Sequence, residues 1–223
     1  VSDGAEVLFD STTLFDVSAG STADNTEFSG LELNATDTGN NAITTSGSGA
    51  YNLTITENTF TKFDSTPVNV RGQDDGSDAV TVDISGNTFD QITANAIQVD
   101  TSDDGAFDGT IGSTVDIDNN EINTSGSQTG IYLDELTDNA TVTDNTIDQA
   151  DDGSTTGIQF EAGTGDLDLE ISGGEINATE TGIELAGSAD SLVVDSVTLT
   201  NVAKDGVSVN NPGDAELNDL VVD

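Results

Sequence analysis

Short stretches in which apolar and polar residues alternate recur along the chain at intervals of about 23 to 34 residues. The clearest copies read apolar, two residues, Asn, one residue, apolar. Alternation with a period of two predicts strands that bury one face, and no stretch shows the 3.6-residue period of a helix. The copies span residues 28–33, 55–60, 84–89, 117–122, 142–147 and 171–176, with weaker ones at 194–199 and 217–222.

A second alternating pattern lies downstream of each copy, typified by Gly157-Ile158-Gln159-Phe160. Stretches rich in Gly, Ser, Asp and Thr separate the two patterns, and the variation in repeat length falls within them. Loops that absorb insertions between constant strands are typical of solenoids. We therefore expect two or three short strands per repeat. The other members of the second pattern span residues 42–44, 67–70, 96–99, 130–133, 182–185 and 206–209.

No Asn-Gly hairpin signal joins matched strands, which favours parallel stacking of successive coils. The Asn-x-Phe/Ile corner, as in Asn87-Thr88-Phe89, and the Gly-Ile-x-Leu strand at residues 130–133 resemble the PbH1-type repeats of the pectate-lyase-like superfamily. The resemblance covers residues 26–223 and implies an all-β fold, a right-handed parallel β-helix solenoid of about 7–8 coils. Residues 1–25 align poorly, and we expect an irregular first coil or cap remnant there. The superfamily contains lyases, hydrolases, epimerases, adhesins and viral spikes, so the resemblance implies a fold rather than an activity.

Four asparagines, Asn58, Asn87, Asn120 and Asn145, occupy the same position of the first pattern. We expect them to form a ladder, because Asn tolerates a left-handed bend and its amide can bond to neighbouring coils. The alternative is a row of polar ligands. Gly174 takes this position in the next coil and interrupts the row of side chains.

The chain is extremely acidic, with 43 Asp and Glu against 3 Lys and Arg and a formal charge of −40. Nucleic acid and anionic membranes are therefore not expected partners, because both require cationic side chains. Self-repulsion at low salt predicts screening by concentrated salt or neutralisation by bound cations. The composition is similar to that of proteins from extreme halophiles. A calcium-loaded surface protein of a marine organism is the alternative.

Three Asp-Asp-Gly loops with nearby aspartates are the candidate metal ligands. Such oxygen-rich clusters suit Ca²⁺ or loosely bound, hydrated Na⁺ or K⁺. The alternative is solvated turn residues in an acidic protein, and neither an EF-hand spacing nor a Gly-Gly-x-Gly-x-Asp repeat is present. No other cofactor is expected. The candidate residues are Asp74, Asp75, Asp78, Asp103, Asp104, Asp108, Asp151 and Asp152.

The sequence gives little support for catalysis. It has no His and no Cys, so neither a Ser-His nor a Cys-His pair can form. A lyase would need a basic residue, and Lys62, Arg71 and Lys204 stand without a partner motif. A hydrolase needs two carboxylates roughly 5–10 Å apart, and 43 acidic residues produce such pairs by chance. We assign no catalytic residue and favour a chain that is not an enzyme.

Asn-x-Ser/Thr sequons are candidate glycosylation sites. Asn34, Asn123 and Asn177 each follow the corner pattern by one residue, so glycans there would decorate one edge of the rod and imply export. The alternative is that Asn followed by Thr is common in such turns. The five sequon residues are Asn34, Asn52, Asn123, Asn139 and Asn177.

These features favour a non-catalytic extracellular module, a stalk, fibre, adhesive segment or spike of a cell surface or virion, adapted to high salt. The alternative is a polysaccharide-binding or polysaccharide-degrading domain, which predicts exposed aromatics. Tyr51 and Tyr132 are the only tyrosines, and Trp is absent. A third hypothesis is an ion-responsive module that folds only when cations bind.

Neither end of the chain shows a convincing cap, and uncapped coils expose strand edges. We therefore expect self-association, adjoining coils or other subunits at the ends, and a surface glycan as a further partner. Residues 1–4 lack the basic start and apolar region of a signal peptide, and no apolar run could span a membrane. We expect an excised or mature piece of a longer protein without direct membrane contact.

Overall fold

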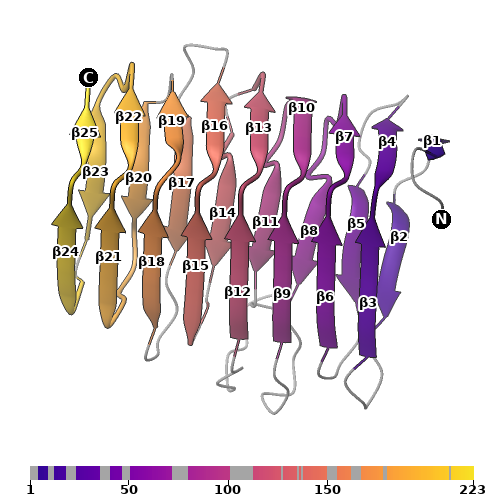
Figure 1. Ribbon diagram of the computed structural model, residues 1–223, viewed down its shortest axis with the longest axis horizontal. Coiled ribbons are helices and arrows are strands. Elements are labelled where there is room, and N and C mark those ends of the chain that lie inside the picture. The colour runs from indigo at the N-terminus through magenta and orange to yellow at the C-terminus, as the bar shows by residue number, and fades with distance from the viewer. Residues whose placement is uncertain are drawn as a thin grey trace.

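Three parallel β-sheets wind around one apolar core in the computed structural model of this protein (Figure 1). We name them sheets A, B and C. Every coil passes from sheet C through sheet A to sheet B, and each strand pairs in parallel with its equivalent one coil further on. The structure describes residues 5–9, 13–18, 24–35, 41–46, 51–71, 80–100, 113–126, 128–134, 136, 138–149, 155–161, 167–177, 180–210 and 212–223.

Sheets A, B and C contain nine, eight and eight strands among these residues. Sheet A consists of β1 (Ala5–Phe9), β4 (Leu31–Ala35), β7 (Thr59–Thr61), β10 (Thr88–Ile92), β13 (Glu121–Thr124), β16 (Thr146–Gln149), β19 (Glu175–Asn177), β22 (Thr198–Thr200) and β25 (Val221–Val222). Sheet B consists of β2 (Thr13–Ser18), β5 (Asn41–Ser46), β8 (Val68–Arg71), β11 (Ile97–Asp100), β14 (Ile131–Asp134), β17 (Thr156–Glu161), β20 (Thr181–Leu185) and β23 (Asp205–Val209). Sheet C consists of β3 (Asp24–Ser29), β6 (Tyr51–Thr56), β9 (Val80–Ser85), β12 (Ser113–Asp118), β15 (Asn139–Thr143), β18 (Asp168–Ser172), β21 (Ser191–Asp195) and β24 (Asp214–Asn218).

The coil is right-handed. In Figure 1 the chain rises along sheet C on the near face, returns downward through sheet B behind it, and advances from right to left. Seven complete coils run from β3–β5 to β21–β23, with partial coils β1–β2 and β24–β25 at the two ends of the described part. The predicted fold class is thus confirmed. No helix among the described residues has the length and apolar character needed to cross a bilayer.

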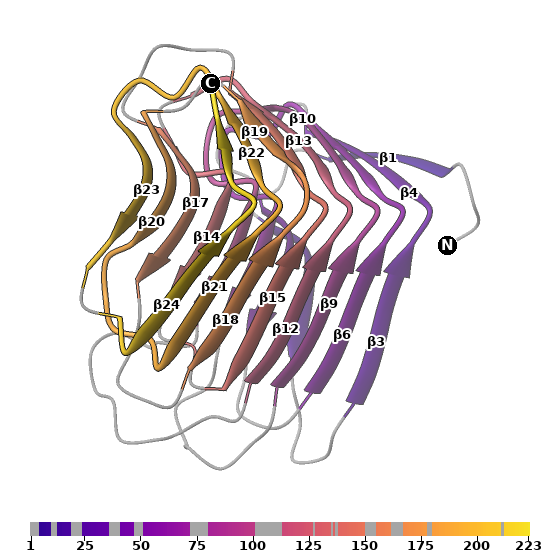
Figure 2. The same cartoon turned by 60° about the vertical axis from the view of Figure 1, so that its left-hand side comes forward.

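Each coil contributes three strands because the first sequence pattern covers two of them. Ile55 lies in sheet C, Phe60 lies in sheet A, and the chain bends sharply between them (Figure 2). The second pattern is the strand of sheet B, as in β14. The bend turns the two apolar positions of one pattern toward a common interior. The apolar side chains of both patterns therefore pack in the same core.

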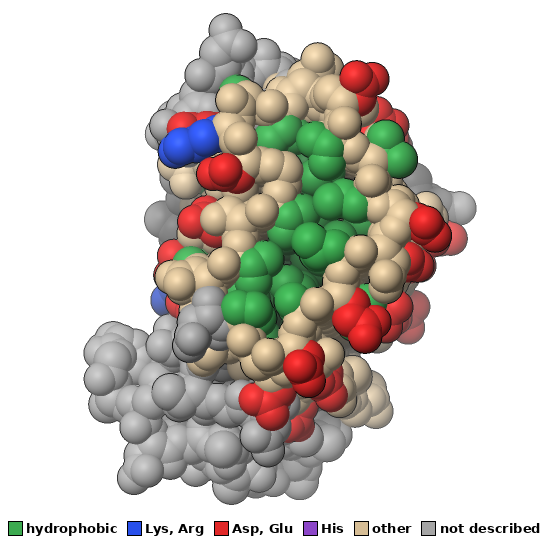
Figure 3. Space-filling view, turned by 90° about the vertical axis from the view of Figure 1, so that its left-hand side faces the viewer, with side chains coloured by type: hydrophobic (Ala, Val, Ile, Leu, Met, Phe, Trp, Pro, Cys, Tyr) green, Lys and Arg blue, Asp and Glu red, His purple; other side chains and the backbone are tan. Residues whose placement is uncertain are grey.

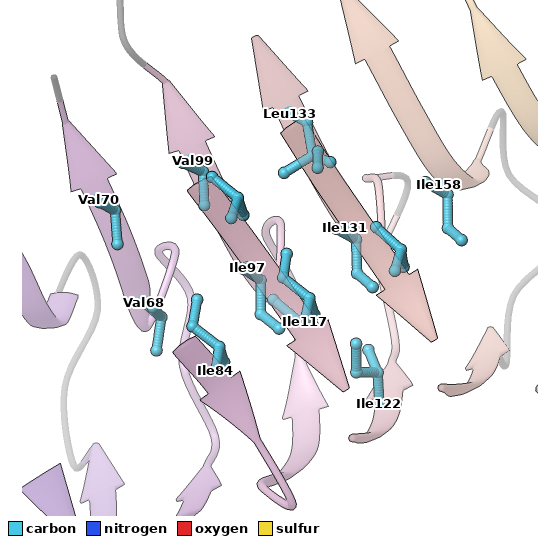
Figure 4. Packing of buried hydrophobic residues seen from close by; sticks show 14 of the residues in the cluster. Val68, Val70, Ile84, Ile97, Val99, Ile117, Ile122, Ile131, Leu133 and Ile158 are labelled. Atoms are coloured by element: carbon cyan, nitrogen blue, oxygen red, sulfur yellow. The ribbon is translucent and has the colours of Figure 1, made fainter. Parts of the chain in front are cut away.

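The core is a set of parallel rows of branched aliphatic side chains, one residue per coil (Figure 4). Val68, Ile97, Ile131 and Ile158 form one such row on sheet B, each at most 3% exposed. In sheet A, Phe60 and Phe89 stack with ring centroids 4.8 Å apart and an interplanar angle of 9°. That spacing matches the distance between neighbouring strands, so parallel register itself stacks identical side chains.

The predicted asparagine ladder is present at the bend between sheets C and A. Asn58 Nδ2 donates to Asn87 Oδ1 at 3.0 Å, Asn87 Nδ2 to Asn120 Oδ1 at 3.0 Å, and Asn120 Nδ2 to Asn145 Oδ1 at 3.0 Å. Each of these oxygens also accepts the backbone N–H of the preceding asparagine, at 2.9 to 3.0 Å. All four side chains are at most 5% exposed. The ladder therefore satisfies the buried polar groups of the bend.

The expectation that the ladder asparagines adopt the left-handed conformation is wrong. The residue before each one has the positive φ, for example Glu57 at 56° and Asp144 at 51°. The asparagine side chain can turn inward because its neighbour makes the bend. Gly174 departs from this pattern, with a φ of 74° of its own. A Cβ atom there would lie against the carbonyl oxygen of Asn145, which explains why the ladder ends at this coil.

Candidate functional site

The predicted metal ligands in the three Asp-Asp-Gly loops, from Asp74 to Asp152, lie outside the described residues. Within the described part of the chain, no group of three or more acidic side chains is placed to hold a metal ion. The outward-facing columns, which are sets of residues paired in register along a sheet, carry most of the described charge.

Carboxylates and neutral residues tend to alternate along these outward columns. In sheet A, Glu121, Thr146, Glu175 and Thr198 are successive partners. Like charges directly opposite each other destabilise a sheet, so alternation lowers the repulsion between coils about 4.8 Å apart. Among the described strand pairs, acidic residues are direct partners only at Glu6–Glu32, at Asp83–Asp116 and in the run Asp100–Asp134–Glu161.

The run Asp100–Asp134–Glu161 lies on the outer face of sheet B, in β11, β14 and β17. Three successive carboxylates in register are unusual in a chain that otherwise separates them. Arg71 is the partner of Asp100 on the other side, so a basic residue stands at one end of the column. This column is the most concentrated array of ionisable groups on the described strands.

Tyr132 lies in the neighbouring column and joins two of these carboxylates. Its hydroxyl is 3.0 Å from Glu161 Oε2 and 3.2 Å from Asp134 Oδ2, and Gln159 Nε2 donates to Glu161 Oε1 at 3.0 Å. One phenol proton can serve only one of the two carboxylates at a time. Burial raises the pKa of the Tyr132 phenol far above its ordinary value, with added contributions from the Asp134 charge and the Glu161 hydrogen bond. The phenol is therefore a neutral donor throughout the physiological range.

Amide side chains flank Tyr132 in its own column. Gln98 and Gln159 are its partners in register, and Asn69 is the next residue beyond Gln98. Beyond these amides the column continues with Thr44 and Glu184. Asn95 Nδ2 donates to Gln98 Oε1 at 3.4 Å, and Thr129 Oγ1 donates to Gln159 Oε1 at 3.0 Å. Asn69 is 5% exposed, and its Oδ1 has no hydrogen-bond partner. Two parallel columns, one of amides with a phenol and one of carboxylates, thus form a polar strip along sheet B.

The three basic residues lie in different places. Lys62 is exposed and has a φ of 61°, just after β7 in sheet A. Arg71 ends β8 in the strip on sheet B, so the two residues that share a coil lie on different sheets. Lys204 pairs with Glu180 at 3.0 Å on the surface, and this hydrogen bond and charge raise the Lys204 pKa. The structure therefore does not gather the basic residues into one site.

All five sequon asparagines belong to strands rather than to turns. Asn34, Asn123 and Asn177 lie in sheet A, while Asn52 and Asn139 lie in sheet C. Asn177 Nδ2 donates to Asp148 Oδ1 at 3.2 Å, and Asn52 Nδ2 donates to Asn25 Oδ1 at 2.8 Å. Glycosylation of these two amides would compete with existing bonds. Their glycosylation, like that of the other three, stays a prediction.

The strip on sheet B was not among the sites expected from the sequence. One signal could have found it, because Asp100, Asp134 and Glu161 each follow the second pattern by one residue. Reading that position down the aligned repeats gives Arg, Asp, Asp and Glu in succession. The bonds between Tyr132 and the carboxylates depend on side-chain geometry, which the alignment does not contain.

A family model described as "Right handed beta helix region" matches residues 15–220. No curated protein and no solved structure shows significant similarity to the chain. The match covers nearly the whole chain and agrees with the right-handed coil of the structure. The chain belongs to the right-handed β-helix family.

Proposed function

We propose that this chain is a non-catalytic structural module, a rod segment of an extracellular stalk, fibre, adhesin or virion spike that works at high salt. The observation that carries the proposal is the face formed by the last coil. Strands β23, β24 and β25 end their sheets there, so one edge of each lacks a neighbouring strand among the described residues. A rod built of stacked coils can continue through such a face.

This end face is apolar at its centre and acidic at its rim (Figure 3). Leu217 and Val222 are 51% and 57% exposed, although their partners in the preceding coil, Val194 and Leu199, are fully buried. Val221, on the outer face of sheet A, is 53% exposed. Val207 and Val209 add half-buried side chains. Stacking a further β-coil on this face would bury the apolar side chains of the last coil and would pair its free strand edges. A second copy of the chain or adjoining sequence could supply that coil.

The charge pattern supports work in concentrated salt. Alternation reduces repulsion between neighbouring coils but leaves the formal charge of −40 in place. The acidic rim around the apolar face would oppose stacking until salt screens it. Kosmotropic salts also strengthen the burial of apolar groups, so in such salts screening and apolar burial both favour assembly.

Sedimentation velocity in low and in molar KCl tests the proposal. We expect the chain to be monomeric at low salt and to assemble end to end in molar salt. The double variant Leu217→Ser/Val222→Ser should stay monomeric. Val193→Ser, which changes a partly exposed valine on the outer face of sheet C, is the matched control and should assemble. A wild-type chain that is monomeric at every salt concentration would contradict end-to-end stacking.

A second candidate function is the binding or cleavage of a polysaccharide on the polar strip of sheet B. The Tyr132–Asp134–Glu161 cluster favours it, because amides, carboxylates and a phenol are suited to binding sugar hydroxyls. Asp134 and Glu161 are also direct partners on adjacent coils, at a strand spacing similar to the carboxylate separation of about 5 Å in retaining glycosidases.

Glycan arrays and hydrolysis assays in molar salt, with and without Ca²⁺, test the second function. Binding or cleavage that is lost in Glu161→Gln and kept in Glu216→Gln, an exposed acid of sheet C, would support it. Binding unaffected by Glu161→Gln would place any glycan site elsewhere. An inactive chain that binds no glycan would leave the structural role as the better account.

A further inference from the structure

Three polar side chains at one corner of the core each bury one atom that has no hydrogen-bond partner among the described residues. Thr124, Gln149 and Thr155 are 2%, 1% and 1% exposed, and Thr124 Oγ1, Gln149 Oε1 and Thr155 Oγ1 make no hydrogen bond. An unsatisfied buried polar atom destabilises a fold, and native structures contain few of them. Three in one place therefore require an explanation.

The three residues belong to two adjacent coils, where sheet A passes into sheet B. Thr124 ends β13 and Gln149 ends β16, and the two are partners in register that face the core. Gln149 Nε2 donates to the carbonyls of Gln128 at 3.1 Å and Thr156 at 3.3 Å. Its amide thus reaches toward sheet B, next to Thr155, and its Oε1 lies at the same corner.

Polar residues at this corner replace apolar ones. The partner of Thr124 in the preceding coil is Ile92, a fully buried side chain. A β-branched apolar residue therefore fits the position, and Thr124 adds only a hydroxyl. The hydroxyl and the Gln149 carbonyl are the parts of this corner that packing alone does not account for.

We propose that one water molecule binds between Thr124 Oγ1, Gln149 Oε1 and Thr155 Oγ1. Water can donate two hydrogen bonds and accept others, so it can donate to the amide oxygen and to one hydroxyl while accepting from the other hydroxyl. Buried waters typically make about three such bonds. A monovalent cation fits less well, because all three ligands are neutral and a charge in this interior would lack compensation. The water would tie the β13–β14 turn to the start of β17.

The test is a double-mutant cycle between Thr124→Val and Thr155→Val, with unfolding measured in molar salt. Valine keeps the branched shape and removes the hydroxyl. If the hydroxyls bind water, each single variant should raise the unfolding equilibrium constant by about tenfold, because the other ligands lose a shared partner. The two effects should be less than additive, because the first substitution already disrupts the site. Thr146→Val, an exposed position of β16, is the control and should change little.

The opposite result has a clear signature. If the hydroxyls are truly unpartnered, removing either one eliminates a desolvated polar group, and both variants should become more stable. Stabilisation, or strictly additive losses, would overturn the proposal. A crystal structure provides the independent readout: an ordered water within hydrogen-bonding distance of all three atoms supports the site, and a dry corner or a bound cation contradicts it.

Discussion

Asp134 and Glu161 are partners in register on sheet B, and both lie within 3.2 Å of the hydroxyl oxygen of Tyr132. The phenol hydroxyl lies between these two carboxylates and is the hydrogen-bond donor that they share. Elsewhere on the described strands, a neutral residue usually stands between acids in the column. Here the neutral group comes from the neighbouring column. The strip is thus stabilised by one shared donor.

Alkaline pH should weaken the fold through Tyr132. Its phenol has a raised pKa in the folded chain, so the unfolded phenol ionises first, near pH 10. Above that pH the folded state binds more protons than the unfolded state, and stability must fall as pH rises. Tyr51→Phe removes the other tyrosine. In that background, we expect the midpoint temperature of thermal unfolding to fall above about pH 10. The added substitution Tyr132→Phe should abolish this fall in the midpoint temperature with pH. The same fall in the Tyr132→Phe variant would contradict the prediction.

Asn87→Ala should strongly destabilise the rod. The substitution removes the acceptor of Asn58 N and Nδ2 and the donor to Ile55 O, all of them buried. We expect a loss of about 3 kcal/mol or more in chemical denaturation. Asn139→Ala, at an exposed position of β15, is the control and should stay within about 0.5 kcal/mol. Equal losses of unfolding free energy in the Asn87→Ala and Asn139→Ala variants would mean that the ladder hydrogen bonds do not stabilise the fold.

Extending the ladder by Gly174→Asn should fail. The repeat pattern makes asparagine the expected residue there, yet the backbone has a φ of 74° and a Cβ would meet Asn145 O. We expect destabilisation of about 1–3 kcal/mol, measured by thermal or chemical unfolding. A neutral or stabilising outcome would show that the bend can relax to the form seen in the preceding coils.

Asp83→Asn should stabilise the chain at low salt. Asp83 and Asp116 are direct partners in sheet C, and their like charges are separated by one strand spacing. We expect a gain of roughly 0.2–1 kcal/mol at low ionic strength that disappears in molar salt. Glu170→Gln is the control, because its partners Thr141 and Val193 are uncharged, and its effect should be smaller.

The burial of polar residues at the corner of the core could not be predicted from the sequence pattern. Thr124 and Gln149 lie inside the fold, yet in the sequence they resemble the polar loop residues that follow them. Their burial depends on where the chain turns from sheet A into sheet B. Likewise, Glu57 rather than Asn58 adopts the left-handed conformation, and a pattern of residue types cannot distinguish the two.

The sequence by itself determined the fold. Rows of Ile, Val, Leu and Phe with a period of two can be buried only on one face of a strand, and their repetition requires the coils to stack. The same alignment determines which residues become neighbours, including Asp100, Asp134 and Glu161. Tertiary structure alone decided how one bend divides the first pattern between two sheets and that Tyr132 bridges two carboxylates. Those features depend on backbone direction and side-chain geometry in three dimensions, which residue spacing does not encode.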